Sequence, residues 1–258
     1  KVLPPTIKID QPNDKLNLEQ SPFYLNTESR PWIRGSDHPR RAGVSSFGFG
    51  GSNFHLALEE YQGDNPHADR IRSFPVELLA ISGPDGASVA DQARALADRA
   101  TAPGMLQRIA WESAQSYDPT ANARLGLVAT DEADLSAKLA RLADIVAKDP
   151  TTGFSHPDGS VYGLGPKSGG VAFLFPGQGS QYLNMGGALA MAFDAARGPW
   201  DRTADLDLGA QQRIDQVVFP IPRFNDEDRA NDEACLRATE FAQPAIGTTS
   251  LWLLSMMG

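Results

Sequence analysis

Cysteine is nearly absent from this sequence: Cys235 is the single one among 258 residues, so the chain cannot form an internal disulfide. Long hydrophobic runs are also missing, and no stretch approaches the roughly 18 consecutive apolar residues of a membrane span. The first residues lack the long apolar core of a secretory signal. These absences predict a cytoplasmic chain without a membrane span.

Positive charge is scarce as well. Lys and Arg number 23 against 32 Asp and Glu, which gives a formal net charge of -9. An acidic chain has no general attraction for phosphate polymers or anionic membrane surfaces, and this argues against nucleic acid as a partner. Hydrophobic residues make up 41% and charged residues 21%, values close to those of soluble globular domains rather than collagen-like or disordered chains.

Isolated catalytic groups are not found either. No Gly-x-Ser-x-Gly nucleophile elbow occurs, and the four histidines lack metal-ligand spacing. Cys235 lies in an acidic stretch, which would raise its pKa and lower its reactivity. The acidic run at 225–233 lacks the central glycine and the final glutamate spacing of an EF-hand loop. We therefore expect a solvated acidic face there and no metal site.

Composition divides the chain into three regions. We assign domain boundaries that give the segments 1–61, 62–168 and 169–258. The first is rich in Pro, Asn and Gly, and two strand-like runs, 42–47 and 54–58, flank a glycine turn. This arrangement predicts a β-hairpin, because glycine adopts the positive φ of a tight turn at little cost.

Apolar periodicity in the middle region predicts a small α/β domain of two strands and three helices, in the order 76–82, 88–100, 105–117, 124–130 and 132–148. Ser88 and Asp131 stand where side chains cap the N-termini of helices. We expect this domain to pack on its neighbours, since two short strands cover helices poorly. The last helix repeats apolar residues at helical spacing on one buried face: Leu135, Leu139, Leu142 and Val146.

The third region opens with a continuous apolar run, 171–175, followed by Pro-Gly. Such a run predicts a fully buried central strand. A helix over 181–197 is expected next, closed by Gly198 as its C-terminal glycine. A final helix is expected to start near 243–244, where proline fits the first turn, and to reach the last residue.

Two glycine-rich loops are the best candidates for chemistry: Phe-Gly-Phe-Gly-Gly-Ser-Asn-Phe-His at 47–55 and Phe-Pro-Gly-Gln-Gly-Ser-Gln at 175–181. The first is either a tight hairpin turn or a loop whose backbone N–H groups approach a reacting carbonyl. The second is either a phosphate cradle or half of an oxyanion hole. It lacks the Lys and Ser or Thr of a P-loop, which weakens the phosphate interpretation. No attacking group accompanies either loop.

These loops and their flanking segments resemble a known enzyme family. Residues 1–7, 23–32 and 40–55 are similar to the C-terminal end of a β-ketoacyl synthase in a modular polyketide or fatty-acid synthase. Residues 171–181 and 239–251 resemble the beginning of a malonyl-CoA:acyl-carrier-protein acyltransferase. The Phe-Gly-Phe-Gly-Gly loop is most similar to the polyunsaturated-fatty-acid branch, and enediyne-type iterative synthases come next.

The resemblance implies an α/β fold class in three parts: a thiolase-like ketosynthase C-terminal hairpin, a small α/β linker domain, and the start of an α/β-hydrolase-like acyltransferase. It also implies roles at the two loops. The backbone N–H of Phe49 would complete the ketosynthase oxyanion hole, with its ring as a gate, and the N–H of Gln178 would be one acyltransferase oxyanion donor. The substrate-binding turns would be shaped by the neighbouring glycines: Gly48, Gly50, Gly51, Gly177 and Gly179.

The implied function is that of an acyltransferase within a multidomain synthase, which moves acyl or malonyl units from coenzyme A to the phosphopantetheine of an acyl carrier protein and condenses them. The attacking residues of both sites are expected outside this chain, so the fragment alone should be inactive and bind no cofactor. Its expected partners are the carrier protein, the remaining ketosynthase and acyltransferase segments, and a second copy through the ketosynthase. The alternative is a non-catalytic scaffold that spaces the catalytic domains and docks the carrier protein through local arginines: Arg40, Arg41, Arg70 and Arg72.

Overall fold

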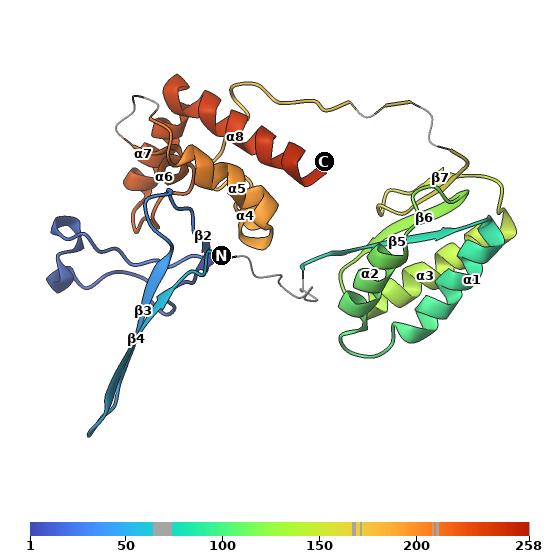
Figure 1. Cartoon of the computed structure of the whole chain (residues 1–258), viewed down its shortest axis with the longest axis horizontal. Helices are drawn as coiled ribbons and strands as arrows, with labels where there is room; N and C mark the ends of the chain where they lie inside the picture. The colour runs from blue at the N-terminus through green and yellow to red at the C-terminus, as the bar shows by residue number, and fades with distance from the viewer. Residues whose placement is uncertain (64–73, 167–168, 171, 208, 210–211, 258) are drawn as a thin grey trace. The chain divides into compact units, whose positions relative to one another are not determined.

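The computed structural model describes residues 1–257 apart from 64–73, 167–168, 171, 208 and 210–211. The chain forms two compact units, one from Lys1–Asp64 together with Ala172–Gly258 and one from Asn65–Val171 (Figure 1). We call the first the split unit, because its two segments are far apart in the sequence, and the second the middle unit. Each has a hydrophobic core of its own. The assignment of three domains along the sequence stays a prediction.

The middle unit is an antiparallel sheet packed against helices. Its strands lie in the order β5 (Glu77–Gly83), β6 (Ala123–Ala129), β8 (Val161–Leu164) and β7 (Phe154–Ser155). Its helices are α1 (Gly86–Arg99), α2 (Met105–Ser116) and α3 (Glu132–Lys148). Alternate residues of β5 and β6 are buried, which is the pattern of a sheet with one face on the core.

The two long strands and three helices predicted for the middle unit are confirmed. Asp131 caps α3 as expected, because its carboxylate accepts a hydrogen bond from the backbone N–H of Asp134 at 2.8 Å. The cap predicted for the first helix is wrong: Asp85, not Ser88, caps α1 by accepting the N–H of Ser88 at 2.8 Å. The predicted buried face of α3 is fully inaccessible to solvent: Leu135, Leu139, Leu142 and Val146.

The split unit joins short strands from its first segment to helices from its second. Strands β1 (Val2–Leu3) and β2 (Arg30–Pro31) pair with each other, and the 3-10 helices η1 (Asp14–Leu16) and η2 (Leu18–Gln20) lie between them in sequence. The helices are α4 (Gly187–Ala192), α5 (Asp194–Thr203), α6 (Ile214–Val218), α7 (Asp226–Arg237) and α8 (Thr239–Met257). Trp200, Phe219 and Trp252 are buried at the centre of their core, and the rings of Trp200 and Phe219 meet edge to face at 4.9 Å.

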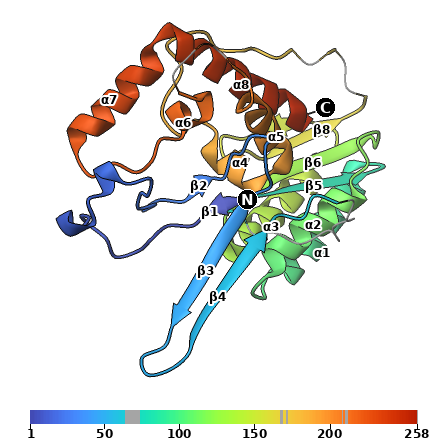
Figure 2. The ribbon, with the colours of Figure 1, turned by 60° about the vertical axis from the view of Figure 1, so that its left-hand side comes forward.

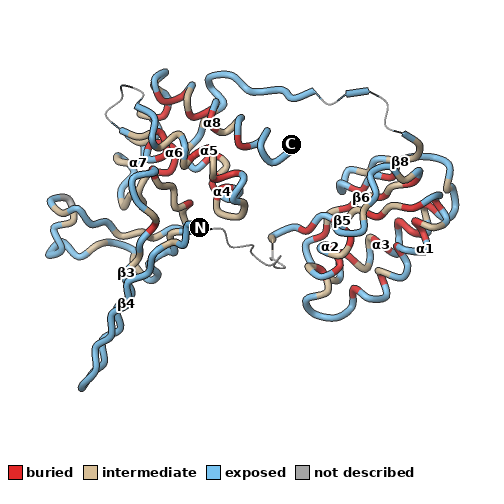
Figure 3. The backbone as a smooth tube through the Cα atoms, in the orientation of Figure 1, coloured by how far each residue is buried: buried red, intermediate tan, exposed pale blue. Residues whose placement is uncertain are grey.

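The predicted hairpin is confirmed as β3 (Arg41–Phe47) paired antiparallel with β4 (Asn53–Glu59). The two strands extend side by side as a narrow ribbon (Figure 2). Nearly all of their residues are exposed (Figure 3). Gly50 at the turn has φ +113°, a backbone conformation that residues other than glycine rarely adopt.

Three expectations for the third region are wrong. The described residues of the apolar run, 172–175, form no strand, and Leu174 is 93% exposed, because none of the strands described in this unit pairs with them. The helix expected over 181–197 is replaced by turns and two helices, so Gly198 lies inside α5 instead of ending a helix. The final helix starts at Thr239, which places Pro244 inside α8.

Candidate functional site

The second glycine loop forms a tight turn whose backbone is held by its own side chains. Ser180 Oγ donates to the carbonyl of Gly177 at 2.7 Å, and the N–H of Gly179 donates to Gln181 Oε1 at 2.7 Å. Gly179 has φ +105°, so this position requires glycine. A helix does not follow directly, since α4 starts only at Gly187. A helix dipole therefore does not act on this turn.

Gln178 connects this turn to helix α8. Its Nε2 donates to Thr239 Oγ1 at 3.3 Å, and Gln243 Nε2 makes a longer contact of 3.5 Å with Gln178 Oε1. The backbone N–H of Gln178 has no hydrogen-bond partner among the residues that the structure describes. The sequence analysis singled out Gln178 but missed both α8 side chains, because their proximity arises only when the segments pack together.

A pocket of about 700 Å³ lies between this turn and α8. Gly177 and Gln178 line one side of it, and most of the remaining lining is apolar: Phe175, Ile246, Leu251 and Leu254. The residues of the turn are exposed, so its donors act more strongly on a developing negative charge than donors in water only when a bound acyl group excludes solvent from the pocket. The turn therefore combines a cleft, apolar walls and one unused backbone donor.

Nucleophilic groups do not complete this site. Ser250 also lines the pocket, but its Oγ donates to the carbonyl of Ile246 in the preceding helical turn. Ser180 likewise donates to a backbone carbonyl. Neither hydroxyl is hydrogen bonded to a histidine that could remove its proton. Within the described residues, neither of these two hydroxyls is therefore activated for nucleophilic attack.

The first glycine loop is the tip of the β3–β4 hairpin. The N–H of Gly48 donates to the carbonyl of Ser52 at 3.1 Å, and the N–H of Gly50 donates to Gly48 O at 3.1 Å. Gly51 faces open space, and Phe49 is fully exposed. Phe49 does not line the pocket at Gln178. The structure thus does not bring the two predicted loops into one site.

A second pocket of about 480 Å³ was missed by sequence analysis. Arg30 reaches into it from β2, donating to the carbonyl of Phe219 and, at 3.2 Å, to the hydroxyl of Tyr24. Two further arginines line it, and each forms a bidentate pair with a carboxylate: Arg213 with Asp215 and Arg223 with Asp232. Carboxylates therefore neutralise Arg213 and Arg223, whereas the hydrogen-bond partners of Arg30 among the described residues are neutral oxygens, so the positive charge of Arg30 is left uncompensated in this pocket.

Cys235 lines this second pocket and is half-buried. Burial raises the pKa of its thiol, and the carboxylates of Asp232 and Glu240 raise it further. The raised pKa predicted from the acidic surroundings is confirmed. Cys235 is therefore protonated near neutral pH and unsuited to act as a nucleophile.

Two of the arginines considered for carrier-protein docking are engaged in ion pairs. Arg40 is buried and donates to Glu60 and Asp201, so it cannot belong to an exposed docking patch, and that expectation is wrong. Arg41 is exposed but pairs with Glu59 across the hairpin at 2.7 Å. Arg70 and Arg72 lie outside the described residues.

No group of His, Cys, Asp and Glu able to hold a metal ion occurs in the part of the chain that the structure describes. Among the same residues, no helix has both the length and the apolar character needed to cross a bilayer. The acidic run at 225–233 forms the capped first turns of α7, where Asn225 accepts the N–H of Asp228 at 2.8 Å.

Residues 12–120 match the family model for the ketoacyl-synthetase C-terminal extension. Over 95% of its length the chain is 32% identical to one polypeptide of the polyunsaturated fatty acid synthase of Thraustochytrium sp. and 32% identical to polyketide synthase GfsA of Streptomyces halstedii. It spans only 10% and 3% of those two proteins. The acyl transferase domain of ZmaA has a similar fold, with a TM-score of 0.53 and 18% identity over 69% of this chain and 38% of that domain. This likeness and the mixed α/β architecture confirm the predicted fold class.

Proposed function

Because the chain is homologous to part of the multidomain polyketide and polyunsaturated-fatty-acid synthases, we propose that it serves acyl transfer and condensation in such a synthase. In this function an acyl or malonyl unit passes from coenzyme A to the phosphopantetheine thiol of an acyl carrier protein. Units are then joined by decarboxylative carbon–carbon bond formation. The polyunsaturated-fatty-acid type is favoured by the Phe-Gly-Phe-Gly-Gly loop at 47–51.

The observation that carries this proposal is the unused N–H of Gln178 beside an apolar pocket. Attack on a thioester carbonyl produces a tetrahedral intermediate whose oxygen carries negative charge. A fixed backbone donor stabilises that charge, and loss of one such donor typically costs about 3 to 4 kcal/mol of transition-state stabilisation. Phe175, Ile246 and Leu254 provide apolar surface against which the acyl portion can lie.

We assign the turn residues as follows. Gln178 supplies the oxyanion donor, and its side chain fixes the turn on α8 through Thr239. Gly177 and Gly179 allow the backbone to approach the substrate, with the N–H of Gly179 kept in place by Gln181. The attacking nucleophile and its base are contributed by segments of the synthase outside these residues. The chain alone therefore holds substrate-binding parts and not a complete catalytic centre.

The test is Gly179→Ala in the synthase polypeptide that carries this sequence. A methyl group at position 179 meets no atom within 4 Å but is strained by φ +105°, so the turn must change its backbone. We expect radiolabelled malonyl loading to fall by roughly a hundredfold to a thousandfold, the usual effect of losing one oxyanion donor. Gly104→Ala is the matched control, because Gly104 has φ +81° and equally open space in the middle unit. Equal loading rates in the two variants would refute the assignment.

Phe49 is proposed to act in condensation. Its ring is fully exposed at the hairpin tip, so Phe49→Ala removes no packing within the described structure and leaves folding unaffected. We expect this variant to load malonate normally and to change the rate or chain-length selectivity of condensation. A condensation assay run beside the loading assay separates the two steps. Unchanged condensation with unchanged products would contradict a role for Phe49.

A further inference from the structure

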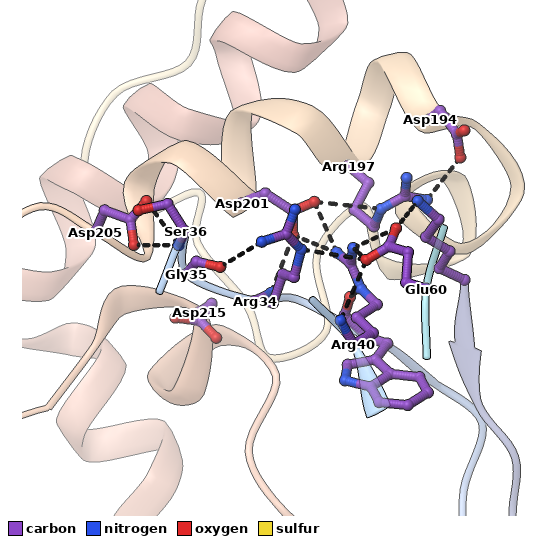
Figure 4. Close-up of polar contacts among 12 residues, drawn as sticks. Arg34, Gly35, Ser36, Arg40, Glu60, Asp194, Arg197, Asp201, Asp205 and Asp215 are labelled. Carbon is purple, nitrogen blue, oxygen red and sulfur yellow. Dashed lines mark hydrogen bonds and ion pairs between the residues drawn. The ribbon is translucent and has the colours of Figure 1, made fainter. Parts of the chain in front are cut away.

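One arginine of the first segment is buried against a helix of the second. The side chain of Arg40 is only 4% exposed, and its guanidinium donates to both oxygens of Asp201 on α5, at 2.6 and 2.7 Å. It also donates to both oxygens of Glu60, at 3.1 and 2.9 Å, and to the carbonyl of Trp32 at 2.7 Å. Figure 4 shows these contacts converging on Arg40. Asp201 is bound by Nη2, Glu60 by Nη1 and the Trp32 carbonyl by Nε, so all three nitrogens of the planar guanidinium are engaged and its orientation is fixed.

Further hydrogen bonds connect the same two segments on either side of Arg40. The backbone N–H of Arg34 donates to Asp201 Oδ1 at 3.0 Å, and the N–H of Ser36 donates to Asp205 Oδ1 at 2.8 Å. Arg197 lies 3.5 Å from Asp201, one turn away on α5. These partners are 161 to 169 positions apart in the sequence, except for the pair within α5. The contact is therefore an interface between segments and not a local turn.

The electrostatics of this cluster favour one arrangement. Burial alone would raise the pKa of Glu60, but hydrogen bonds from Lys1 and Arg40 outweigh it and lower that pKa to about 2. Glu60 is thus ionised at neutral pH, and its charge is compensated by Arg40 and Arg34. Removing one partner from a buried ion pair leaves an uncompensated charge, so such clusters strongly disfavour partial separation.

Apolar contacts extend the interface beyond the charges. Ile33 packs against the core formed by the helices, and Pro31 lies 4.0 Å from the position that a Cβ on Gly187 would take. Arg30 donates to the carbonyl of Phe219 across the same boundary. The second pocket is lined by residues of both segments as well. Charge, hydrogen bonding and packing all hold the first segment on α4, α5 and α6.

We propose that Arg30–Glu60, which belong to the condensing part of the synthase, dock directly on helix α5, which belongs to its acyl-transfer part. These two segments bind each other, and the middle unit is inserted between them in the sequence. The assignment of the two parts rests on the proposed function, whereas the contact itself does not. Arg40 and Asp201 are the central pair of the interface.

A disulfide tests the proximity of the segments. A Cβ built on Gly35 lies 3.7 Å from Asp205 Cγ, close to where a cysteine sulfur at position 205 would lie. In a Cys235→Ser background, Gly35→Cys with Asp205→Cys adds the only two thiols of the chain. We expect mild oxidation to join them within one chain, as detected by peptide mass spectrometry. The single variants serve as controls, because neither can form an intramolecular disulfide.

Failure to form the disulfide, when both single variants react with maleimide, would overturn the interface. A second measurement covers the case in which the double variant does not fold. Asp201→Asn should speed amide hydrogen exchange at least tenfold in residues 32–41, although the change is on α5. Asp226→Asn, an exposed carboxylate on α7, is the matched control and should leave that exchange unchanged. Equal exchange in the two variants would also overturn the proposal.

Neither readout depends on acyl transfer, so the two proposals fail separately. If the disulfide forms but Gly179→Ala loads malonate as fast as Gly104→Ala, the interface stands and the oxyanion assignment falls. If loading is lost as expected and residues 32–41 exchange independently of Asp201, the interface falls and the oxyanion assignment stands.

Discussion

Gly186→Ala provides a quantitative test of how α8 is held beside the candidate pocket. Gly186 precedes α4 with φ +71°, and a Cβ at this position would lie 2.7 Å from Cζ2 and 3.1 Å from Cε2 of Trp252. Trp252 is 2% exposed and lies on α8, the helix that carries Gln243. The indole cannot move without disturbing its core, so the added methyl group must displace either the turn or the helix.

The expected magnitude has two parts. A non-glycine residue in the left-handed region costs about 1 to 2 kcal/mol, and overpacking a well-filled core costs about 1 to 3 kcal/mol. Together these predict that Gly186→Ala lowers the free energy of unfolding of the split unit by about 2 to 5 kcal/mol. Gly209→Ala supplies the first part alone, because Gly209 has φ +68° and no atom within 4 Å of the added carbon.

The assay is urea unfolding followed by tryptophan fluorescence in a Trp111→Phe background. Trp111 is the one tryptophan of the middle unit, so the remaining three, Trp32, Trp200 and Trp252, report on the split unit. The difference between Gly186→Ala and Gly209→Ala isolates the contact with Trp252. Equal losses of stability in the two variants would refute the close packing of Gly186 on α8.

Three further outcomes are expected. Leu139→Ala creates a cavity at a fully buried position of α3 and should lower the free energy of unfolding of the middle unit by about 2 to 5 kcal/mol. Amide exchange should become faster in β6 and stay unchanged in α5. Faster exchange in both units would contradict their separate cores. The pKa of Glu60 is lowered to about 2, so the stability that its carboxylate confers is present above the unfolded pKa of about 4.3 and is lost as the pH falls toward 2. Glu60→Gln should therefore flatten the pH dependence of the free energy of unfolding between these two values. An unaltered pH profile would count against the pairing of Glu60 with Arg40. Cys235 has a raised pKa through burial and the nearby carboxylates, so iodoacetamide should alkylate it more slowly than a small free thiol at pH 8, and Asp232→Asn should speed the reaction; a rate equal to that of the free thiol would show that these carboxylates have no influence.

The middle unit was predictable because its signals are local. Apolar residues recur at helical spacing within one helix, and Asp131 stands immediately before the helix that it caps. The error at α1 is also local: Asp85 and Ser88 are both good capping residues, and the chain uses the earlier one. The strands β7 and β8 have 2 and 4 residues, too few for periodicity to identify.

The split unit was less predictable because its contacts are distant in sequence. The apolar run ending at Phe175 has the composition of a central strand, yet a strand needs partners, and composition does not show whether they are present. The turn at Gln178 was identified from its glycines, whereas its contact with Thr239 required the packing of α8. The partnership of Arg40 with Asp201 had no sequence signal, since nothing local distinguishes this arginine from Arg41.

The distance along the chain between Arg40 and Asp201 also affects synthesis. Asp201 leaves the ribosome 161 residues after Arg40, which at about 5 to 20 residues per second is a delay of roughly 8 to 30 seconds. The middle unit lies wholly between them, so it can fold while the earlier segment still waits for its counterpart. During that interval Arg40 has Glu60 but not yet Asp201, and Ile33 lacks the helices against which it packs, so the first segment is completed only when α5 has been synthesised.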